Sequence, residues 1–161
     1  MKKNDQKICL VTGANSGIGK EIALGLAKSG AHVIMVCRDL KRGQTAQEEI
    51  KITSGSKSID LLIADLSSQA DIRSLAKAIH ERYTRLHVLI NNAGLVLSKR
   101  TLSADGIEMT IATNHLGPFL LTRLLLDLLE KSSPSRIINV SSAIHKWARI
   151  DLNDIQYENR K

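Results

Sequence analysis

Residues 12–19, Thr12-Gly13-Ala14-Asn15-Ser16-Gly17-Ile18-Gly19, decide the fold of this chain. They follow a short apolar run at residues 8–11 and precede a segment in which Ile22 and Leu26 recur at helical spacing. Glycines at such a turn let the backbone approach a pyrophosphate, and the N–H groups at the helix start face its oxygens. The stretch therefore predicts a dinucleotide-binding unit. The glycine spacing is Gly-x3-Gly-x-Gly rather than the more familiar Gly-x-Gly-x-x-Gly. The alternative to a dinucleotide-binding unit is a strand–helix turn that binds no ligand.

The rest of the chain alternates apolar runs with helical segments. The predicted strands occupy residues 8–11, 32–37, 59–64, 86–90 and 136–140. The first predicted helix ends at Gly30, the second spans residues 40–52, and the third begins after Ser67 or Ser68. Further helical segments lie within residues 106–131, where Pro118 marks a break or kink. Continuous apolar strands separated by helices indicate parallel strands covered on both faces. Right-handed crossovers then give a doubly wound α/β sheet, the Rossmann fold.

Length and composition indicate one globular domain. We interpret residues 1–161 as a single, partial dinucleotide-binding domain, because 161 residues suit one domain. The net charge is +7, but the basic residues are scattered beside acids, and aromatic residues make up only 2% of the chain. A scattered charge without an aromatic platform argues against a nucleic-acid partner.

Neither cysteines nor apolar runs predict a metal site or a membrane span. Cys9 and Cys37 lie in apolar runs, form no CxxC pair and have no histidine at metal-ligand spacing, which predicts free buried thiols and no metal. Residues 1–6 are too short and polar for a signal peptide, and charges interrupt the leucine-rich residues 116–129. We therefore expect no transmembrane segment in this chain and a cytoplasmic location.

Further motifs, taken in order, resemble the short-chain dehydrogenases/reductases. They are Thr12-Gly-x3-Gly-x-Gly19, Asp65-Leu66, Asn91-Asn92-Ala93-Gly94, Asn114 and Asn139-Val140-Ser141-Ser142. The surroundings of these motifs look most like the retinol-dehydrogenase-like branch, on the strength of Cys37-Arg38-Asp39, residues 113–117 and residues 138–142.

The resemblance implies a set of cofactor-binding residues. The pyrophosphate turn would be shaped by Gly13, Gly17 and Gly19, and the cofactor would lie along Asn15, Ser16 and Ile18. The adenine would meet Asp65 and Leu66. The nicotinamide-side ribose would be approached by Asn92, Ala93 and Gly94. Two structural alternatives stay open. Asp65 could be an ordinary helix cap, and Asn91-Asn92 could be a turn that ties neighbouring strands.

The end of the second predicted strand indicates the cofactor. An NAD enzyme usually carries a carboxylate there for the ribose hydroxyls, whereas this chain has Cys37 followed by Arg38. A guanidinium can bind a 2′-phosphate in fork geometry, so Arg38 favours NADP(H). The alternative is a surface arginine paired with Asp39. Lys20 and Lys41 could add positive potential, but solvated side chains are the preferred interpretation of both.

The resemblance also implies catalytic residues. Ser142 matches the serine that polarises the substrate oxygen, and Asn114 matches the asparagine that supports a proton relay at a helix kink. The family's acid/base is a tyrosine followed four residues later by a lysine. Tyr157 and Lys161 have this spacing, but we expect a rim or packing role for Tyr157 and the catalytic pair beyond Lys161. The chain is thus interpreted as an amino-terminal portion, incomplete at the C-terminal side of the sheet.

These expectations lead to two principal hypotheses. The first is an NADP(H)-dependent oxidoreductase that interconverts an alcohol and a carbonyl, with a small-molecule, lipophilic substrate such as a retinoid. The second is a truncated product that binds cofactor or partners without catalysis. A sugar-nucleotide epimerase or dehydratase fits the motifs less well. A homo-oligomer is expected only where the full-length fold is present.

Overall fold

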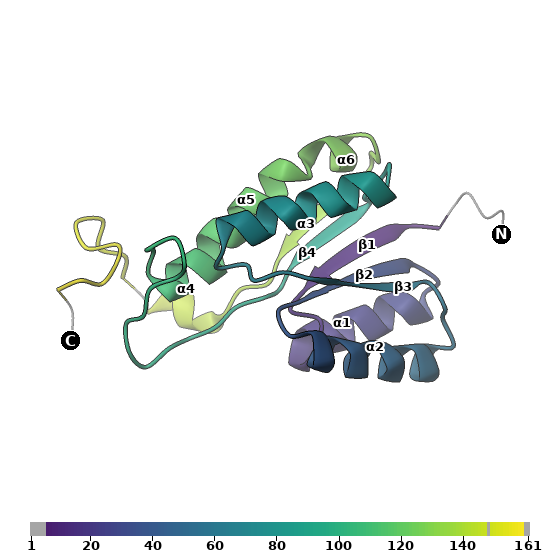
Figure 1. The fold of residues 1–161 in the computed structure, drawn as a ribbon, viewed down its shortest axis with the longest axis horizontal. Helices are drawn as coiled ribbons and strands as arrows, with labels where there is room; N and C mark the ends of the chain where they lie inside the picture. The colour runs from purple at the N-terminus through teal and green to yellow at the C-terminus, as the bar shows by residue number, and fades with distance from the viewer. Residues whose placement is uncertain (1–5, 148, 160–161) are drawn as a thin grey trace.

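The computed structural model describes residues 6–147 and 149–159, which form a five-stranded parallel sheet in the order β3-β2-β1-β4-β5 (Figure 1). The strands are β1 (Ile8–Thr12), β2 (His32–Cys37), β3 (Ile59–Ile63), β4 (Val88–Asn91) and β5 (Arg136–Asn139). All four pairings are parallel, with β1 central between β2 and β4. The predicted doubly wound sheet is confirmed, because the chain winds from β1 outward to β3 and then crosses to β4 and β5.

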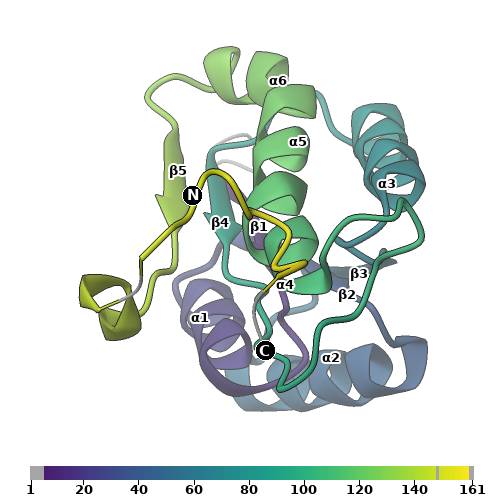
Figure 2. The ribbon, with the colours of Figure 1, turned by 90° about the vertical axis from the view of Figure 1, so that its left-hand side faces the viewer.

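Helices cover both faces of the sheet. Helices α1 (Gly17–Lys28) and α2 (Leu40–Ser54) lie on one face, and α3 (Gln69–Arg82), α5 (Gly117–Leu124) and α6 (Leu126–Glu130) lie on the other (Figures 1 and 2). The first layer buries residues such as Ala23, Ala27 and Ile50 against the sheet, and the second buries Ile72 and Leu121. Small alanines on α1 bring that helix close to the strands, as a dinucleotide fold requires.

Local sequence explains where these helices begin and end. Asp39 caps α2 by accepting a hydrogen bond from the backbone N–H of Arg42, and Ser68, one of the two serines predicted for α3, accepts from the N–H of Asp71. Gly30, which follows α1, has a φ of 86°, and Gly55, which caps α2, has a φ of 70°. A positive φ is easily adopted only by glycine. Helix α1 therefore ends just before Gly30, as predicted, and α2 extends two residues past its predicted end, to Ser54.

The helical stretch after β4 is irregular. It consists of α4 (Met109–Ile111), a π-helical turn (Ala112–Leu116) and α5, in which Pro118 is the second residue. Proline has no N–H to donate to the carbonyl of Asn114 and its ring crowds that carbonyl, so a regular helix cannot pass through this point. The predicted break at Pro118 therefore takes the form of a widened turn that contains Asn114.

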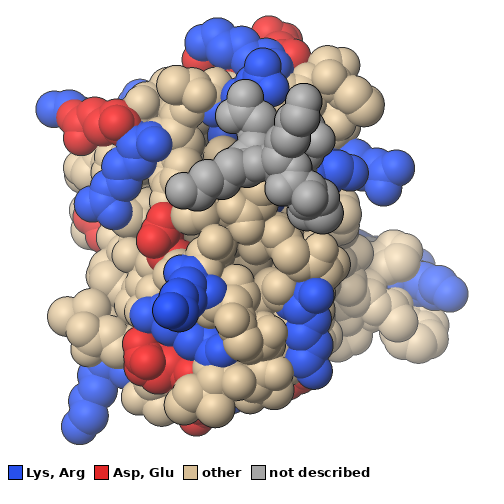
Figure 3. Space-filling view, turned by 90° about the vertical axis from the view of Figure 1, so that its right-hand side faces the viewer, with Lys and Arg blue, Asp and Glu red and all other residues tan. Residues whose placement is uncertain are grey.

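Strand β5 lies at the edge of the sheet and differs from the others, since all four of its residues are exposed. It leads to a short 3-10 helix (Ala143–Lys146) and then to residues 149–159, which return across the molecule toward α4 (Figure 2). Within the described ranges, no helix is long and apolar enough to cross a membrane. At the amino ends of the strands, Lys and Arg lie in separate groups, several of them beside Asp or Glu (Figure 3).

Candidate cofactor and active site

The carboxyl ends of β1, β2, β3 and β4 surround a cavity of about 340 Å³. It is lined by Gly13, Asn15, Ser16, Ile18, Gly19, Val36, Cys37, Arg38, Arg42, Ala64, Asp65, Leu66, Asn92, Ala93, Gly94, Leu95 and Thr113. The structure thus brings together every residue that the sequence proposed for the cofactor except Gly17. Gly17 begins α1 with a φ of 52°, so it shapes the turn without lining the cavity.

The glycine turn is packed against the loop after β4. A Cβ at Gly19 would lie 2.3 Å from the carbonyl oxygen of Gly13 and 2.3 Å from the side-chain nitrogen of Asn92. A Cβ at Gly13, which also has a φ of 67°, would lie 2.9 Å from the Cα of Ala93. These distances leave no room for a side chain, so both glycines are required by the close approach of two loops.

Thr12 and Asn92 join those two loops by hydrogen bonds. The hydroxyl oxygen of Thr12 accepts from the backbone N–H of Asn92 and of Ala93, each at 3.0 Å. The Asn92 side chain donates to the carbonyl oxygen of Thr12 at 2.8 Å. Asn91 donates from its side chain to Asn139 at 2.9 Å, across the β4–β5 pair. The Asn91-Asn92 pair therefore ties strands together, and Asn92 also borders the cavity.

The N-terminus of α1 opens onto the cavity without a side-chain cap. Ser16 occupies the N-cap position but makes no cap hydrogen bond, and the first turn contains no acidic residue. In α2 and α3, by contrast, Asp39 and Ser68 serve as side-chain caps. The first N–H groups of α1 are thus available, with the positive end of the helix dipole, to an anion in the cavity.

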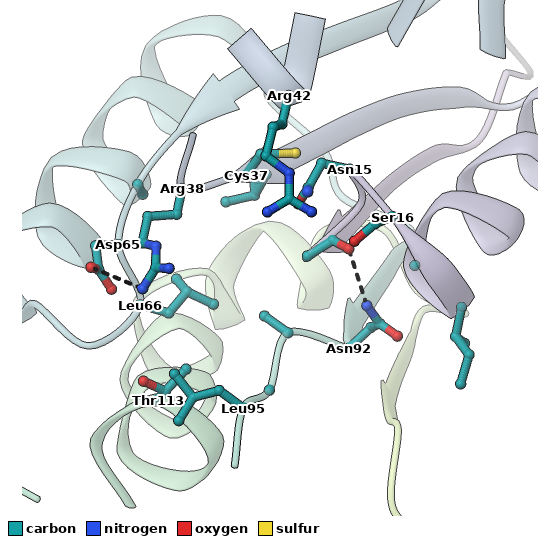
Figure 4. A pocket seen from close by; sticks show the side chains of 17 residues that line it. Asn15, Ser16, Cys37, Arg38, Arg42, Asp65, Leu66, Asn92, Leu95 and Thr113 are labelled. Carbon is teal, nitrogen blue, oxygen red and sulfur yellow. Dashed lines mark hydrogen bonds and ion pairs between the residues drawn. The ribbon is translucent and has the colours of Figure 1, made fainter. Parts of the chain in front are cut away.

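Two arginines face the same cavity from the end of β2 and the start of α2 (Figure 4). Arg38 lies 4.0 Å from a carboxylate oxygen of Asp65, and 69% of its side chain is exposed. The Asp39 carboxylate instead caps α2, so the alternative pairing of Arg38 with Asp39 is not what the structure shows. Arg42, which the sequence analysis missed, points its guanidinium toward Asn15 and Ser16 (Figure 4). The sequence offers no clear signal for it, because its direction depends on how Asp39 caps α2.

Cys37 stands where a ribose-binding carboxylate would lie in an NAD enzyme. Burial raises the pKa of its thiol to about 11, so the group is neutral and adds no negative charge beside the two arginines. Lys20, by contrast, forms an ion pair with Glu49 of α2 and does not line the cavity. The basic character of the cavity mouth thus comes from arginine.

Asp65 and Thr113 complete the wall opposite the glycine turn. One carboxylate oxygen of Asp65 accepts from both the N–H and the hydroxyl of Ser67, so Asp65 orders the turn before α3 while bordering the cavity. The hydroxyl of Thr113 is buried and has no hydrogen-bond partner among the residues that the structure describes. A buried hydroxyl without a partner costs free energy, which fits a wall that a polar ligand completes.

Ser142 and Asn114 meet at a neighbouring, wider cavity of about 1030 Å³ between the loop after β4, α5 and the end of β5. The Asn114 side chain is fixed by the backbone of Leu95, accepting from its N–H at 2.9 Å and donating to its carbonyl oxygen at 2.8 Å. Ser142 is exposed and caps the 3-10 helix, with 3.3 Å between its hydroxyl oxygen and the N–H of Ile144. The structure brings the two predicted catalytic residues to one cavity.

The tyrosines lie away from Ser142. Tyr157 lines a third cavity with Ile155 and Asn114, and Lys161, its proposed partner, lies outside the described residues. Tyr83 is at the far end of α3, where it donates to Asp60. Within the part of the chain that the structure describes, no tyrosine lines the cavity that holds Ser142.

Comparison with known proteins agrees with this geometry. The sequence model of the short chain dehydrogenase family matches residues 7–151. The chain belongs to the short-chain dehydrogenase family. It is 48% identical to human retinol dehydrogenase 11 over 152 residues, which are 94% of this chain and 48% of that protein. It is 44% identical to human retinol dehydrogenase 13 over 155 residues, which are 96% of this chain and 47% of that protein. The chain thus spans about half the length of these curated relatives.

Solved structures of the same family superpose on the fold. A short-chain dehydrogenase from Sphingobium yanoikuyae in complex with NADPH has a TM-score of 0.73 and 30% identity, over 86% of this chain and 54% of that one. A metagenomic short-chain oxidoreductase in complex with NADP has a TM-score of 0.74 and 31% identity, over 84% of this chain and 62% of that one. The family membership that the sequence motifs predicted is confirmed, as is the likeness to retinol dehydrogenases.

Proposed function

We propose that this chain forms the NADP(H)-binding part of an oxidoreductase that interconverts an alcohol and a carbonyl. The observation that carries the proposal is the pair Arg38 and Arg42 at the mouth of the cavity, beside the neutral Cys37. Two guanidinium groups favour binding of a 2′-phosphate. At the position where an NAD enzyme has a carboxylate, which would repel that phosphate, this chain has the thiol of Cys37. The complexes of structural relatives with NADPH and NADP support the same assignment.

The remaining cavity residues fit the rest of a dinucleotide. The uncapped start of α1 and the glycine turn would hold the pyrophosphate, while Asp65 and Leu66 would border the adenine. Asn92, Ala93 and Gly94 would border the nicotinamide-side ribose. When bound, the cofactor supplies or accepts a hydride.

The residues around Ser142 would position the substrate oxygen. The Ser142 hydroxyl would donate a hydrogen bond to that oxygen and polarise it. The Asn114 side chain, held by Leu95, would keep the π-helical turn in place beside it. A lipophilic substrate such as a retinoid is supported by the names of the curated relatives, which are retinol dehydrogenases.

Cofactor titration tests the proposal. We expect the purified chain to bind NADPH at least about tenfold more tightly than NADH, because a charged hydrogen-bonded contact contributes about 1.5–3 kcal/mol. Arg38→Ala should remove most of this preference and leave NADH affinity unchanged. Arg73→Ala, which removes an exposed arginine on α3, is the matched control and should change neither affinity. Tighter binding of NADH, or a preference that survives the Arg38→Ala/Arg42→Ala double variant, would contradict the assignment.

A second candidate, cofactor binding without turnover by this chain, is favoured by the position of Tyr157 away from Ser142. We expect NADPH absorbance to stay at background with a panel of aldehydes and ketones. Sustained turnover that Tyr157→Phe abolishes would exclude this candidate and assign Tyr157 as the acid/base.

A further inference from the structure

The two edges of the sheet differ in how they are protected. At the β3 edge, the side chain of Gln47 on α2 donates to the carbonyl oxygen of Ile59 at 2.7 Å, and Asp60 places a carboxylate within the strand. An occupied edge carbonyl and a charge within an edge strand both discourage pairing with another chain. At the β5 edge, Arg136 begins the strand, and residues 137–140 carry no charge. Strand β5 is thus the less protected edge.

The backbone of β5 presents hydrogen-bonding groups on its outer side. The N–H groups of Arg136 and Val140 each donate, at 2.9 Å, to a carbonyl oxygen on the β4 side of the strand. Because successive residues of a strand point their backbone groups to opposite sides, Ile138 also faces β4, whereas Ile137 and Asn139 face outward. Among residues 6–147 and 149–159, no further segment pairs with this outer side.

The side chains at this edge are apolar and partly uncovered. Ile137, Ile138 and Val140 are 43%, 45% and 39% exposed. Figure 2 shows β5 as the outermost strand of the sheet. A strand added at this edge would therefore gain main-chain hydrogen bonds and also cover apolar side chains.

The outer side of β5 is complementary to itself. When a second copy lies antiparallel with Ile138 opposite its own counterpart, Ile137 of one copy is opposite Asn139 of the other. Outward residues that are opposite in this way exchange both of their N–H···O bonds, and the two Ile138 side chains meet at a pair whose Cα atoms are about 4.5 Å apart. The two Arg136 side chains then lie at opposite ends of the paired strands, whereas in-register parallel pairing would bring these like charges together.

We infer that β5 is an interaction surface for a second copy of this chain, paired antiparallel about a two-fold axis at Ile138. The partner is a second copy because one symmetry operation matches the hydrogen-bonding groups of the edge and separates its charges. The inference goes beyond the proposed function and does not rest on it, since no residue of β5 lines the cavity that contains Arg38.

Sedimentation velocity over a concentration series tests the pairing. One pair of short strands buries less than the roughly 1,200 Å² of a stable interface, so we expect a dissociation constant on the order of 10–100 µM. The wild-type chain should then change from monomer to dimer between about 5 and about 500 µM. A chain that stays monomeric throughout would leave this edge to a strand of another sequence and would overturn the inference.

Substitution at the axis tests whether β5 forms the contact. Ile138→Lys should weaken the association at least about tenfold, because two lysines would replace the contact between two isoleucines. Ile52→Lys is the matched control, since it changes an isoleucine that is 81% exposed on α2, and it should leave the association unchanged. A dimer that Ile138→Lys does not weaken would lie on another surface and would overturn the inference.

Charge exchange tests the register of the pairing. Ile138→Glu should also weaken the association when it is present alone. An equimolar mixture of Ile138→Lys and Ile138→Glu should restore dimers, because opposite charges then face each other at the axis. Restored dimers would also show that both variants fold. Two folded variants, as judged by circular dichroism, that do not associate when mixed would overturn the two-fold register at Ile138.

Residue-resolved hydrogen–deuterium exchange gives a measurement on the wild-type chain that needs no substitution. On going from about 5 to about 500 µM, exchange should slow most at the amides of Ile137 and Asn139, which would donate to the partner strand. It should slow less at the amide of Ile138, which already faces β4. No slowing at Ile137 and Asn139 would overturn the inference, whatever the outcome of NADPH titration.

Discussion

The first half of this molecule, with β1, β2 and the first cavity, and the second half, with β5 and Ser142, differ in how far their residues are buried. Around the first cavity, β1 and β2 are buried on both faces between α1, α2 and the opposite helix layer, and hydrogen bonds of Thr12 join the glycine turn to the loop after β4. In the second half, all four residues of β5 are exposed, and Ser142 lies on a short 3-10 helix at the surface. The residues proposed for the cofactor thus lie beside buried strands, whereas Ser142 lies at the exposed edge of the sheet.

The difference has a physical origin in packing. The residues of β1 and β2 are packed on both faces of the sheet, which fixes the strand ends that carry the first cavity. Ser142 has fewer such constraints, because its strand has helix contacts on only part of its surface. The largest mutational effects are therefore expected in the first half.

The Gly19→Ala substitution should have the largest effect. Its Cβ would meet backbone and side-chain atoms at 2.3 Å, so the glycine turn must move away from Asn92. We expect NADPH binding to weaken by at least about 100-fold and stability to fall by about 1–3 kcal/mol, measured by titration and thermal unfolding. Gly25→Ala in the same helix is the control, since a Cβ there meets nothing within 4 Å. It should leave binding unchanged and stabilise the helix by about 0.5–1 kcal/mol. Equal binding by both variants would break the comparison.

Thr12→Val tests the hydrogen bonds that join the two loops. The substitution keeps the shape but leaves the N–H groups of Asn92 and Ala93 without their acceptor. We expect a loss of about 1–3 kcal/mol in the free energy of unfolding, because these partly buried N–H groups lose their acceptor. Thr12→Ser retains the hydroxyl and should recover most of this loss in urea denaturation. A neutral Thr12→Val would show that the loop network is not what stabilises the first half.

A matched pair of strand substitutions compares the two halves directly. Ile34 in β2 is fully buried, whereas Ile138 in β5 is 45% exposed. Ile34→Val should lower stability by about 1 kcal/mol, and Ile138→Val by less than about 0.5 kcal/mol, since an exposed site leaves no cavity. Similar losses, measured by urea denaturation, would mean that β5 is enclosed in solution and that the halves do not differ.

The smallest expected effect concerns a surface contact between α3 and α6. Both ring nitrogens of His80 face acceptors, the Ala76 carbonyl oxygen at 2.8 Å and an Asp127 carboxylate oxygen at 2.9 Å. The Ala76 carbonyl and then Asp127 raise the pKa of His80, and hydrogen bonds from His80 and Lys131 lower the pKa of Asp127 to about 2. The contact therefore requires the charged forms of both side chains.

The sign of the pH dependence follows from these shifts. The contribution of His80 is fully present below its unfolded pKa of about 6.5 and is lost as the pH rises through the folded value. The contribution of Asp127 is present above its unfolded pKa and is lost as the pH falls toward 2. We expect His80→Gln to cost about 0.5 kcal/mol near pH 5 and less near pH 8, in unfolding measured at both pH values.

His87 provides a control of opposite sign. Its Nδ1 accepts from the N–H of Ile8 at 3.0 Å, and burial, with help from Arg85 and Lys7, lowers its pKa. The stability it provides is therefore present above the unfolded pKa and is lost as the pH falls. The cost of His87→Gln should grow with pH while that of His80→Gln shrinks. Parallel trends would contradict the assignment of both protonation states.

The sequence was most informative where chain geometry depends on nearest neighbours. Strand β2 was predicted at its observed bounds because its apolar run is continuous, and Gly30 marked a real helix end. The resemblance to short-chain dehydrogenases/reductases implied that the glycine turn and the loop after β4 share a site, and both line the first cavity. Sequence motifs also linked Asn114 and Ser142, which the structure places at one cavity.

Features that depend on side-chain direction or on distant segments were harder to predict. Arg42 faces the cavity because Asp39 caps α2 and sets the rotation of its first turn, which sequence spacing alone leaves undecided. The position of residues 150–159 depends on contacts of Gln156 with Arg100 and Glu108, which are far apart in the chain and form no motif. The break at Pro118 was expected, but its π-helical form depends on how the chain packs around Asn114.

Hydrogen–deuterium exchange of the chain with and without NADPH tests the central claim most directly. We expect NADPH to protect residues 12–20, 37–42, 64–66 and 92–95, which line or adjoin the first cavity, and to leave the exchange of residues 136–140 in β5 unchanged. Protection that is absent from residues 12–20, or that is strongest in residues 136–140, would contradict the proposal that the first cavity is the cofactor site.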